Sequence, residues 1–467
     1  MMQNRKLFIL LASISLLITL YIGSSDIPPR YSYIAFLPGL MICLYLMIAI
    51  TLENNAQNFA TSMIAILTFI RYSIVPLLYT LSNYSTIMGA ASYLHGNDAV
   101  FLMMYEAIVI TVAIIFANRK IISNSKTHVY IENTDRLSTI VWLCLLFCII
   151  SSIIFPSIQE IFKTILDLDT EEFSTRDYED LALGTIARII RTLFTVIFNI
   201  TRIIFPIYII RYIAKNKNSV RWTRVFLILF ILLQFLLLTT TFAEAIVSSL
   251  VIFLVVAKLE GNAMKSMKRW AVIFVIAIII TYFSVRFQVG SSMYGNGNAI
   301  EYITLITNAY FTGLDNVAAS INIPRYDTVQ YLQSSILQTI PFNTTLFGPR
   351  NVNMPTLFNA VNGTSGQIPP TIGNGYFYFG YLLAPVISFA FTYLSIILCR
   401  KANLTESIWR YTSYMFISIV LALGISMYNE IIALSWVNAW GIPMFIIAIM
   451  VEKQKKSVGF NGNIKRK

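Results

Sequence analysis

The sequence predicts an all-α polytopic membrane protein with about twelve transmembrane helices and one large external loop that contains short amphipathic helices. Of its 467 residues, 57% are hydrophobic and only 12% are charged, a composition that a water-soluble domain of this size does not tolerate. Apolar runs recur at the length needed to cross a bilayer. The lysines concentrate beside the ends of these runs and orient the protein, so the net charge of +12 does not indicate a nucleic-acid partner.

Twelve apolar segments account for the predicted spans. They are 7–22, 33–52, 60–80, 99–117, 139–155, 192–213, 224–240, 242–258, 270–287, 373–399, 408–427 and 430–451. The first follows a basic start that imitates a secretory signal, but no small-residue cleavage site follows it, so we expect an uncleaved span. The run 225–257 could form one long helix or two spans. Basic residues flank both of its ends, and only two spans return both ends to the cytoplasm.

This topology places every lysine-rich connection and both termini in the cytoplasm. The predicted nine-span bundle covers residues 1–287 and includes an external segment, 156–191. The large external loop covers 288–372, the three final spans 373–451, and the basic cytoplasmic tail 452–467. The large loop contains no lysine, although arginine occurs in it. Because the connections elsewhere are too short to fold alone, we expect the function to reside in this loop and in the helix surfaces that face it.

The large loop is expected to hold two helices. The spacing of apolar residues predicts one helix from Ala299 to Asn322, ending before Pro324. Asp327 is expected to cap a second, short helix. The apolar side of that helix would lie on the membrane surface or cap the bundle, and it comprises Val329, Leu332, Ile336, Leu337 and Ile340. The stretch 341–370 is rich in Asn, Thr, Gly and Pro, which predicts irregular structure.

One face of the sixth span carries a polar stripe. Because each helical residue advances by 100°, Arg188, Arg191, Thr195, Asn199 and Arg202 fall on one narrow line. Ionisable groups inside a membrane are costly and usually face a water-filled cavity or a functional partner. Snorkelling to the headgroups is the alternative for the two outer arginines, but Arg202 lies about half a span deeper. The stripe is therefore a candidate anion site.

Four further arginines are candidates for the same role. Arg286 lies at the entrance to the large loop, and Arg325 and Arg350 lie within it. Arg71 is a second buried cation, in the third span, for which a charge pair with another helix is the alternative. Arginine offers a planar fork of donors that suits phosphate or carboxylate oxygens. In the acid-rich segment before Arg188, local ion pairs are an equally good explanation.

A carboxylate near the external side could act as a general base. The candidates on that side are Glu244, Glu301, Asp315, Asp327 and Glu430. Since Asp327 is expected to cap a helix, we favour Glu301 and Asp315. The sequence has no zinc-ligand spacing, phosphate-binding loop or nucleophile elbow, so no metal and no other cofactor is expected.

A short motif begins the span after the large loop, with Gly373, Tyr376, Phe379 and Gly380 at its fixed positions. Together with the layout of spans and loop, it resembles the Gly-x-x-Tyr-x-x-Phe-Gly motif of the oligosaccharide repeat-unit polymerases (O-antigen polymerase, Wzy-type). Arg71 within FIRYSIVP is also similar to a feature of this family. Two departures are Asn374, where many relatives have an acidic residue, and 239–244, where many have a Ser-Arg pair.

The resemblance implies a multi-pass enzyme of the bacterial cytoplasmic (inner) membrane. It would transfer a growing glycan from undecaprenyl diphosphate to a newly flipped lipid-linked repeat unit. The arginines named above would bind the diphosphate, with Thr195 and Asn199 as a supporting polar face, and Glu301 or Asp315 would be the base.

The lipid-linked oligosaccharide is the expected partner, and a chain-length regulator and a flippase are the protein partners that the family suggests. The alternative functions are a lipid-linked oligosaccharide flippase and an O-antigen-type ligase. The single large loop and the absence of an internal repeat disfavour a transporter. By the same resemblance, the absence of histidine from the large loop favours a polymerase over a ligase.

Overall fold

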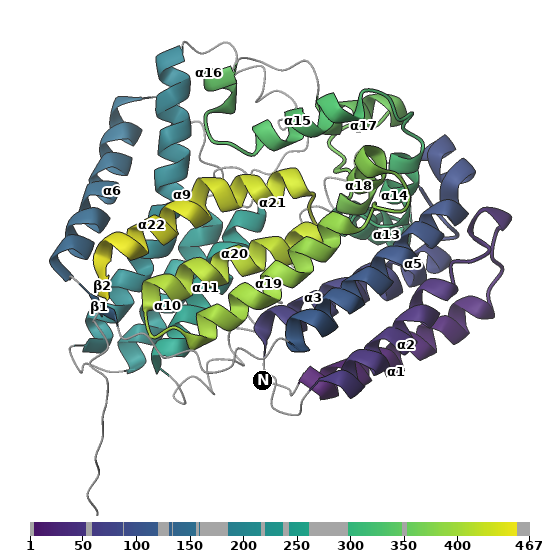
Figure 1. Ribbon diagram of the computed structural model, residues 1–467, viewed down its shortest axis with the longest axis horizontal. Helices are drawn as coiled ribbons and strands as arrows, with labels where there is room; N and C mark the ends of the chain where they lie inside the picture. Colours follow the sequence, from purple (N-terminus) through teal and green to yellow (C-terminus); the bar gives the residue numbers. More distant parts are fainter. Residues whose placement is uncertain are drawn as a thin grey trace, which may run out of the picture.

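The computed structural model is helical almost throughout (Figure 1). It describes residues 4–52, 58–86, 88–119, 130–132, 134–155, 158, 185–215, 220–236, 242–260, 298–347 and 353–454. Within these ranges, eight helical segments are long and apolar enough to cross a membrane: Arg5–Gly23, Pro29–Thr51, Phe59–Leu81, Gly89–Arg119, Arg136–Ile154, Ile186–Ile213, Ile408–Ser426 and Glu430–Val451. The chain is thus a multi-pass helical membrane protein. Twelve spans remain a prediction, and segment 270–287 lies outside the described residues.

The first quarter of the chain forms four long helical segments close to the predicted spans. They are α1 (Asn4–Gly23), η1 (Pro29–Tyr31) followed by α2 (Phe36–Thr51), α3 (Phe59–Phe69) continuing through η2 (Ile70–Ile74) into α4 (Val75–Leu81), and α5 (Gly89–Arg119). Helix α5 begins ten residues before the predicted position 99, with non-helical backbone angles at His95. Helices α1 and α2 pack against each other at one side of the bundle (Figure 1).

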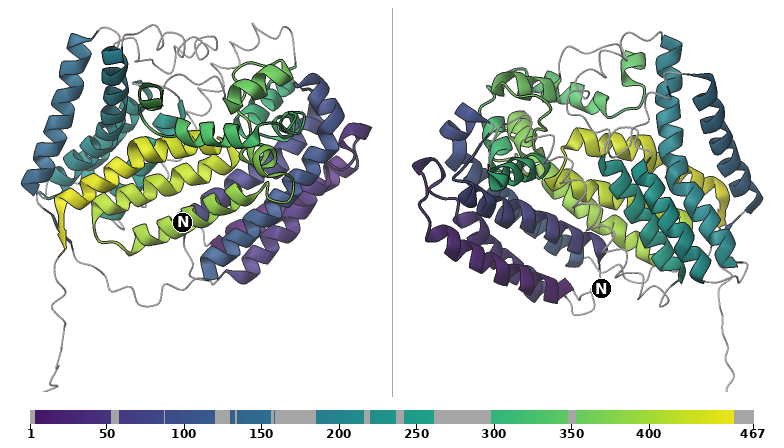
Figure 2. Two further views of the ribbon diagram at one scale, coloured as in Figure 1. Left: turned by 45° about the horizontal axis from the view of Figure 1, so that its top comes forward. Right: turned by 180° about the vertical axis from the view of Figure 1, so that it is seen from behind.

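The middle of the chain forms α6 (Thr134–Ile154), α9 (Thr185–Lys215), α10 (Val220–Leu236) and α11 (Phe242–Glu260). Helix α9 contacts the other three, and together they make the opposite side of the bundle (Figure 2). The apolar run 225–257 is divided between two helices, α10 and α11. That both of them are spans stays a prediction.

The last part of the chain corrects one predicted span. Segment 373–399 is divided into α18 (Thr371–Phe379) and α19 (Val386–Leu404), because Gly380 has a φ of 80° and a turn that includes Pro385 follows it. Next come α20 (Ile408–Ser426), α21 (Glu430–Trp436), η4 (Val437–Gly441) and α22 (Ile442–Val451). A short antiparallel ribbon joins β1 (Tyr130–Glu132) to β2 (Glu452–Gln454), with Tyr130 opposite Gln454.

The large loop folds into helices that gather at one end of the bundle, which we call the loop end (Figures 1 and 2). They are α13 (Ala299–Tyr310), α14 (Leu314–Ile321), α15 (Thr328–Gln338), α16 (Asn343–Phe347) and α17 (Met354–Asn362). The predicted helix 299–322 is therefore broken, at Thr312 with its positive φ and at Gly313. The predicted irregular stretch 341–370 also contains α16 and α17, where Asn353 caps α17.

Helix α15 begins where the sequence predicts, but the predicted cap was wrong. The Asp327 side chain makes no capping hydrogen bond, because its backbone is left-handed, with a φ of 48°. The helix caps the bundle against α18 and α21, yet Val329 and Ile336 are 67% and 55% exposed while Ser334 and Ser335 are buried. The serines face inward because polar groups lie beneath them: the Ser335 hydroxyl is 2.7 Å from that of Tyr378.

Candidate functional site

Arg71 is fully buried and forms an ion pair with Glu106 of α5. Its Nη2 lies 3.1 Å from Glu106 Oε2, and both side chains are 0% exposed. Tyr72 and Ser388 also donate hydrogen bonds to the Glu106 carboxylate, at 2.8 and 2.6 Å. Arg71 therefore forms a charge pair with another helix, which was the alternative to anion binding. The hydrogen bonds and the ion pair at Glu106 hold η2, α5 and α19 together.

Arg71 also helps to cap the end of α20. The last carbonyl groups of a helix have no partner within the helix, and buried ones need an external donor. Three different segments supply these donors: Thr371 Oγ1 to Gly424 at 2.6 Å, Arg71 Nη1 to Ile425 at 2.6 Å, and Thr312 Oγ1 to Ser426 at 3.2 Å. A cation at a helix C-terminus is also favoured by the helix dipole. The end of α20 is thus the point where the bundle and the loop helices meet.

The deep arginine of the α9 stripe is also paired inside the protein. Arg202 Nη1 lies 3.1 Å from Glu244 Oε2 of α11 and 3.1 Å from Asn199 Oδ1. Its Nε donates to Gln234 Oε1 of α10 at 2.6 Å, and Gln234 Nε2 donates back to the Arg202 carbonyl at 2.9 Å. Arg202 and Asn199 therefore hold α9, α10 and α11 together, and the Glu244 charge already neutralises the guanidinium.

The outer part of the stripe has a different environment. Arg188, Arg191 and Thr195 are only half-buried, near the first turns of α9. The Arg188 Nε atom is buried and has no hydrogen-bond partner within the described structure. Helix α16 of the large loop contacts α9, and Figure 1 shows it beside the upper part of this helix. Arg188 and Arg191 are thus the half-buried cations of the stripe, at the end of α9 near the loop helices.

The two predicted base residues lie in contrasting environments. Asp315, near the start of α14, is 0% exposed and accepts hydrogen bonds on Oδ1 from Tyr31, at 3.2 Å, and from Ser92. Its Oδ2 is buried without a hydrogen-bond partner among the described residues. Burial raises the pKa of Asp315 above its usual value. Glu301 lies in the first turn of α13 and is only partly buried.

The predicted motif forms helix α18, which lies deep in the loop end. A Cβ atom at Gly373 would overlap the Ser320 side chain of α14, and one at Gly375 would overlap the carbonyl oxygen of Ala384. Glycine is therefore required at both positions by the close approach of neighbouring segments. Tyr376 is partly buried and Phe379 is exposed, whereas Gly380 is buried at the end of the helix.

Arg325 lies against the C-terminal end of this motif helix. Its Nε donates to the carbonyl of Phe377 at 3.0 Å, and its guanidinium carbon is 5.7 Å from the centre of the Tyr376 ring. A Cβ atom on Gly380 would come within 3.2 Å of Arg325 Nη1. The Arg325 side chain is exposed, so it borders the motif without being enclosed by it.

A polar cluster that we name the Glu430 cluster lies between α15, α18 and α21. Asn374 Nδ2 donates to Glu430 Oε1 at 2.8 Å and to Oε2 at 3.0 Å. Asn374 is 0% and Glu430 6% exposed. Burial and then the charge of Glu430 raise the pKa of Tyr378, whose hydroxyl contacts Ser335 of α15. In the sequence, Glu430 is one of five candidate carboxylates and does not stand out, because its partner Asn374 lies 56 positions away along the chain.

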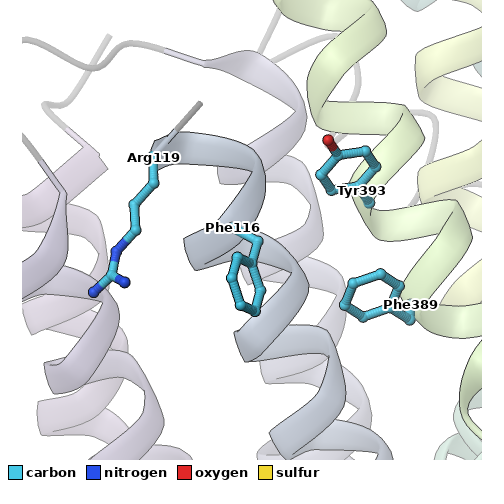
Figure 3. A pocket seen from close by; sticks show the side chains of 4 residues that line it. All are labelled: Phe116, Arg119, Phe389 and Tyr393. Carbon is cyan, nitrogen blue, oxygen red and sulfur yellow. The ribbon is translucent and has the colours of Figure 1, made fainter. Parts of the chain in front are cut away.

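Of the predicted site residues, Arg286 and Arg350 fall outside the described residues. A pocket of about 550 Å³ lies where α5 and α19 run side by side, lined by Phe116, Arg119, Phe389 and Tyr393 (Figure 3). Its aromatic walls face each other while Arg119 points away from them, so its mostly apolar lining suits an apolar chain.

Within the described ranges, no group of three or more His, Cys, Asp or Glu side chains could hold a metal ion. A scan against protein-family models and searches of curated proteins and of solved structures found no match to this chain.

Proposed function

We propose that this chain is a membrane glycosyltransferase that polymerises undecaprenyl-diphosphate-linked oligosaccharide repeat units into surface polysaccharide, O-antigen or capsule, on the external face of the bacterial cytoplasmic membrane. The observation that carries the proposal is the division of the α9 stripe. Arg202 is buried and paired with Glu244, whereas Arg188 and Arg191 are half-buried near a helix of the large loop. The buried Arg188 Nε has no hydrogen-bond partner among the described residues. Two cations at the end of a span suit a diphosphate whose lipid tail stays in the bilayer.

The chemistry of the transfer fits these side chains. Breaking a glycosyl diphosphate bond places negative charge on the leaving diphosphate, and arginine stabilises that charge through paired N–H donors. Arg188 and Arg191 are one helical turn apart, so their side chains lie on the same face of α9. The energy for the transfer comes from the lipid-linked donor, and no soluble nucleotide sugar is needed.

The test is polymerisation by the purified chain in liposomes with its lipid-linked repeat unit, without nucleotide sugar or added metal. We expect a ladder of products spaced by one repeat unit. Arg188→Gln and Arg191→Gln should each slow its formation about ten- to a hundredfold, since a hydrogen bond to a charged group contributes about 1.5–3 kcal/mol. Arg119→Gln removes an exposed arginine at the far end of α5 and serves as the matched control.

Two other functions give different results in the same experiment. A flippase would move labelled lipid across the bilayer without forming a ladder. The buried pairs Arg71–Glu106 and Arg202–Glu244 are the observation in its favour, because transporters often carry ion pairs within the membrane. A ligase would transfer one glycan to a different acceptor and would also make no ladder. Either result would replace the polymerase assignment.

A further inference from the structure

Glu430 differs from other buried glutamates in its partners. Arg71 pairs with Glu106, Arg202 with Glu244, and Arg410 lies 2.8 Å from Glu452. The described structure places no cation within salt-bridge distance of Glu430, whose carboxylate instead meets the neutral amide of Asn374. A buried carboxylate without a compensating cation is costly. A buried carboxylate can lose its charge effect by pairing with a cation or by gaining a proton. Because Glu430 has no cation beside it among the described residues, it is suited to accept a proton.

Among the described residues, Asp315 is the other buried carboxylate without an arginine partner, but it is less suited to meeting a substrate. It is 0% exposed, and Tyr31 and Ser92 bind its Oδ1 from η1 and α5. Glu430 instead stands at the first position of α21, at the loop end, and retains slight exposure. Helix α15 covers it through the contact of Ser335 with Tyr378. A shift of this one surface helix would uncover Glu430, whereas reaching Asp315 would require opening the packing between α14 and α5.

The loop also connects Glu430 with the arginines of α9. Helix α15 contacts α18 and α21, and α16, which follows it after a short turn, contacts α9. Figure 1 shows this segment extending from the side of α18 to the side of α9. Farther along the same helix as Glu430, η4 contacts α9 directly. On the proposed function, a lipid-linked glycan bound at Arg188 and Arg191 would have its sugars on the side of α9 to which this segment leads.

We propose that Glu430 is the catalytic carboxylate of the proposed glycosyl transfer and that Asn374 is its positioning residue; this inference rests on the proposed function. The O–H bond of the attacking sugar hydroxyl breaks, and its proton passes to Glu430. The hydroxyl oxygen forms a bond to the anomeric carbon of the donor glycan. The bond from that carbon to the diphosphate oxygen breaks, and the electron pair leaves with the lipid diphosphate. Asn374 donates hydrogen bonds to both carboxylate oxygens of Glu430 and so fixes its orientation.

The first test is Glu430→Gln, which keeps the size of the side chain and removes the proton acceptor. In the liposome assay we expect ladder formation to slow by about a hundredfold or more, the usual contribution of a general base. Glu406→Gln, at an exposed carboxylate far from α21, is the matched control and should match the wild-type rate. Unchanged polymerisation by a folded Glu430→Gln protein would overturn the inference, as would loss of activity in Glu301→Gln or Asp315→Asn but not in Glu430→Gln.

The second test is the pH dependence of the Asn374 variants, which a purely structural role would not alter. The wild-type rate should rise with pH as Glu430 loses its proton and should then level off. Among the described residues, Tyr378 is the titratable group that faces Glu430. Asn374→Asp places a second carboxylate against Glu430, so the rising limb should move to higher pH. Asn374→Ala leaves Glu430 in place and should lower kcat more than it raises KM. An unchanged profile in both variants would exclude a positioning role.

These results separate the two proposals. A ladder from the wild-type protein that persists in Glu430→Gln would leave the polymerase function standing and remove Glu430 from its mechanism. Absence of a ladder from the wild-type protein would overturn the proposed function and, with it, the role of Glu430. Thermal unfolding of each variant in detergent identifies any that fail to fold. If Glu430→Gln is one of these, Asn374→Ala decides the inference.

Discussion

Glu106 and Glu244 each lie 3.1 Å from an arginine, and those arginines are the two that the sequence places deepest in the membrane. In both pairs the residues come from different helices and the carboxylate is fully buried. A charge in such a place needs its partner, because an isolated buried ion loses its hydration without compensation. Arg71 and Arg202 thus have structural roles that are visible once their partners are known.

We expect Arg71→Met to destabilise the protein by about 3–5 kcal/mol, because it leaves the Glu106 charge uncompensated in the core. The double variant Arg71→Met with Glu106→Gln should recover much of that loss, since no charge then remains buried. A double-mutant cycle of thermal unfolding in detergent measures the coupling. Additive effects of the two substitutions would contradict a direct ion pair.

Asp315 gives a prediction about pH. It lies outside the candidate spans, and burial raises its pKa above the ordinary value of 3.8. Between 3.8 and the raised pKa, the folded protein binds more protons at this site than the unfolded protein does. The contribution of Asp315 to stability therefore falls as pH rises through that window and stays low above it.

We expect Asp315→Asn to remove this dependence and to be as stable as wild type or more stable at pH 7. The asparagine oxygen can still accept the hydrogen bonds from Tyr31 and Ser92. Thermal unfolding measured from pH 4 to pH 8 compares the two proteins. A variant less stable than wild type at pH 7 would mean that the charged carboxylate stabilises the fold.

At the level of elements, the motif helix α18 owes its position to two glycines. Gly373 lets it approach α14, and Gly375 lets the backbone at Ala384 pass directly over it. Asn374 lies between these two glycines, so the close approach on either side holds its amide against Glu430. The short helix is thus a rigid support for one side chain of the Glu430 cluster.

Gly375→Ala should therefore destabilise the protein by about 1–3 kcal/mol, the usual cost of overpacking a core. A Cβ atom at this position would overlap a backbone oxygen that cannot turn aside as a side chain can. Gly23→Ala is the control, because nothing lies within 4 Å of a Cβ built there. Equal melting temperatures for the two variants would show that the backbone at Ala384, in the turn before α19, shifts at little cost to make room for the added Cβ atom.

Helix α15 gives a second prediction at this level, because its serines face inward and part of its apolar side faces outward. In a variant without native cysteines, Val329→Cys should react quickly with a polar maleimide, and Ser335→Cys slowly. Their side chains are 67% and 3% exposed. The reverse order of rates would mean that α15 packs against the bundle through its apolar side.

At the level of the whole molecule, contacts between distant helices constrain the path of the chain. Glu106 contacts Ser388, and Arg400 donates to the carbonyl of Ala117, so α5 and α19 run in the same direction. The end of α11 lies near the end of α19, where Lys258 donates to the carbonyl of Ala402. These ends lie at the side of the bundle opposite the loop helices.

The loop helices begin at the other side, where Thr304 donates to the carbonyl of Leu78 near the end of α4. The predicted ninth span, 270–287, lies outside the described residues. We expect tags at both termini to be reached by antibody only after the inner membrane is permeabilised, whereas Val329→Cys reacts in intact spheroplasts. A terminal tag detected without permeabilisation would contradict the predicted topology.

The amino-acid order predicted the helical membrane class, most helix positions and the division of 225–257 into two helices, because hydrophobic transfer and helical periodicity act over neighbouring residues. It also located the stripe on α9 and the loop that covers the bundle. The breaks at Gly313 and Gly380 and the inward serines of α15 depended on contacts with other segments. The same is true of the roles of Arg71, Arg202 and Glu430. The sequence shows which residues carry a charge. Only the folded structure shows whether an opposite charge or a hydrogen-bond donor lies next to that residue and neutralises or stabilises its charge.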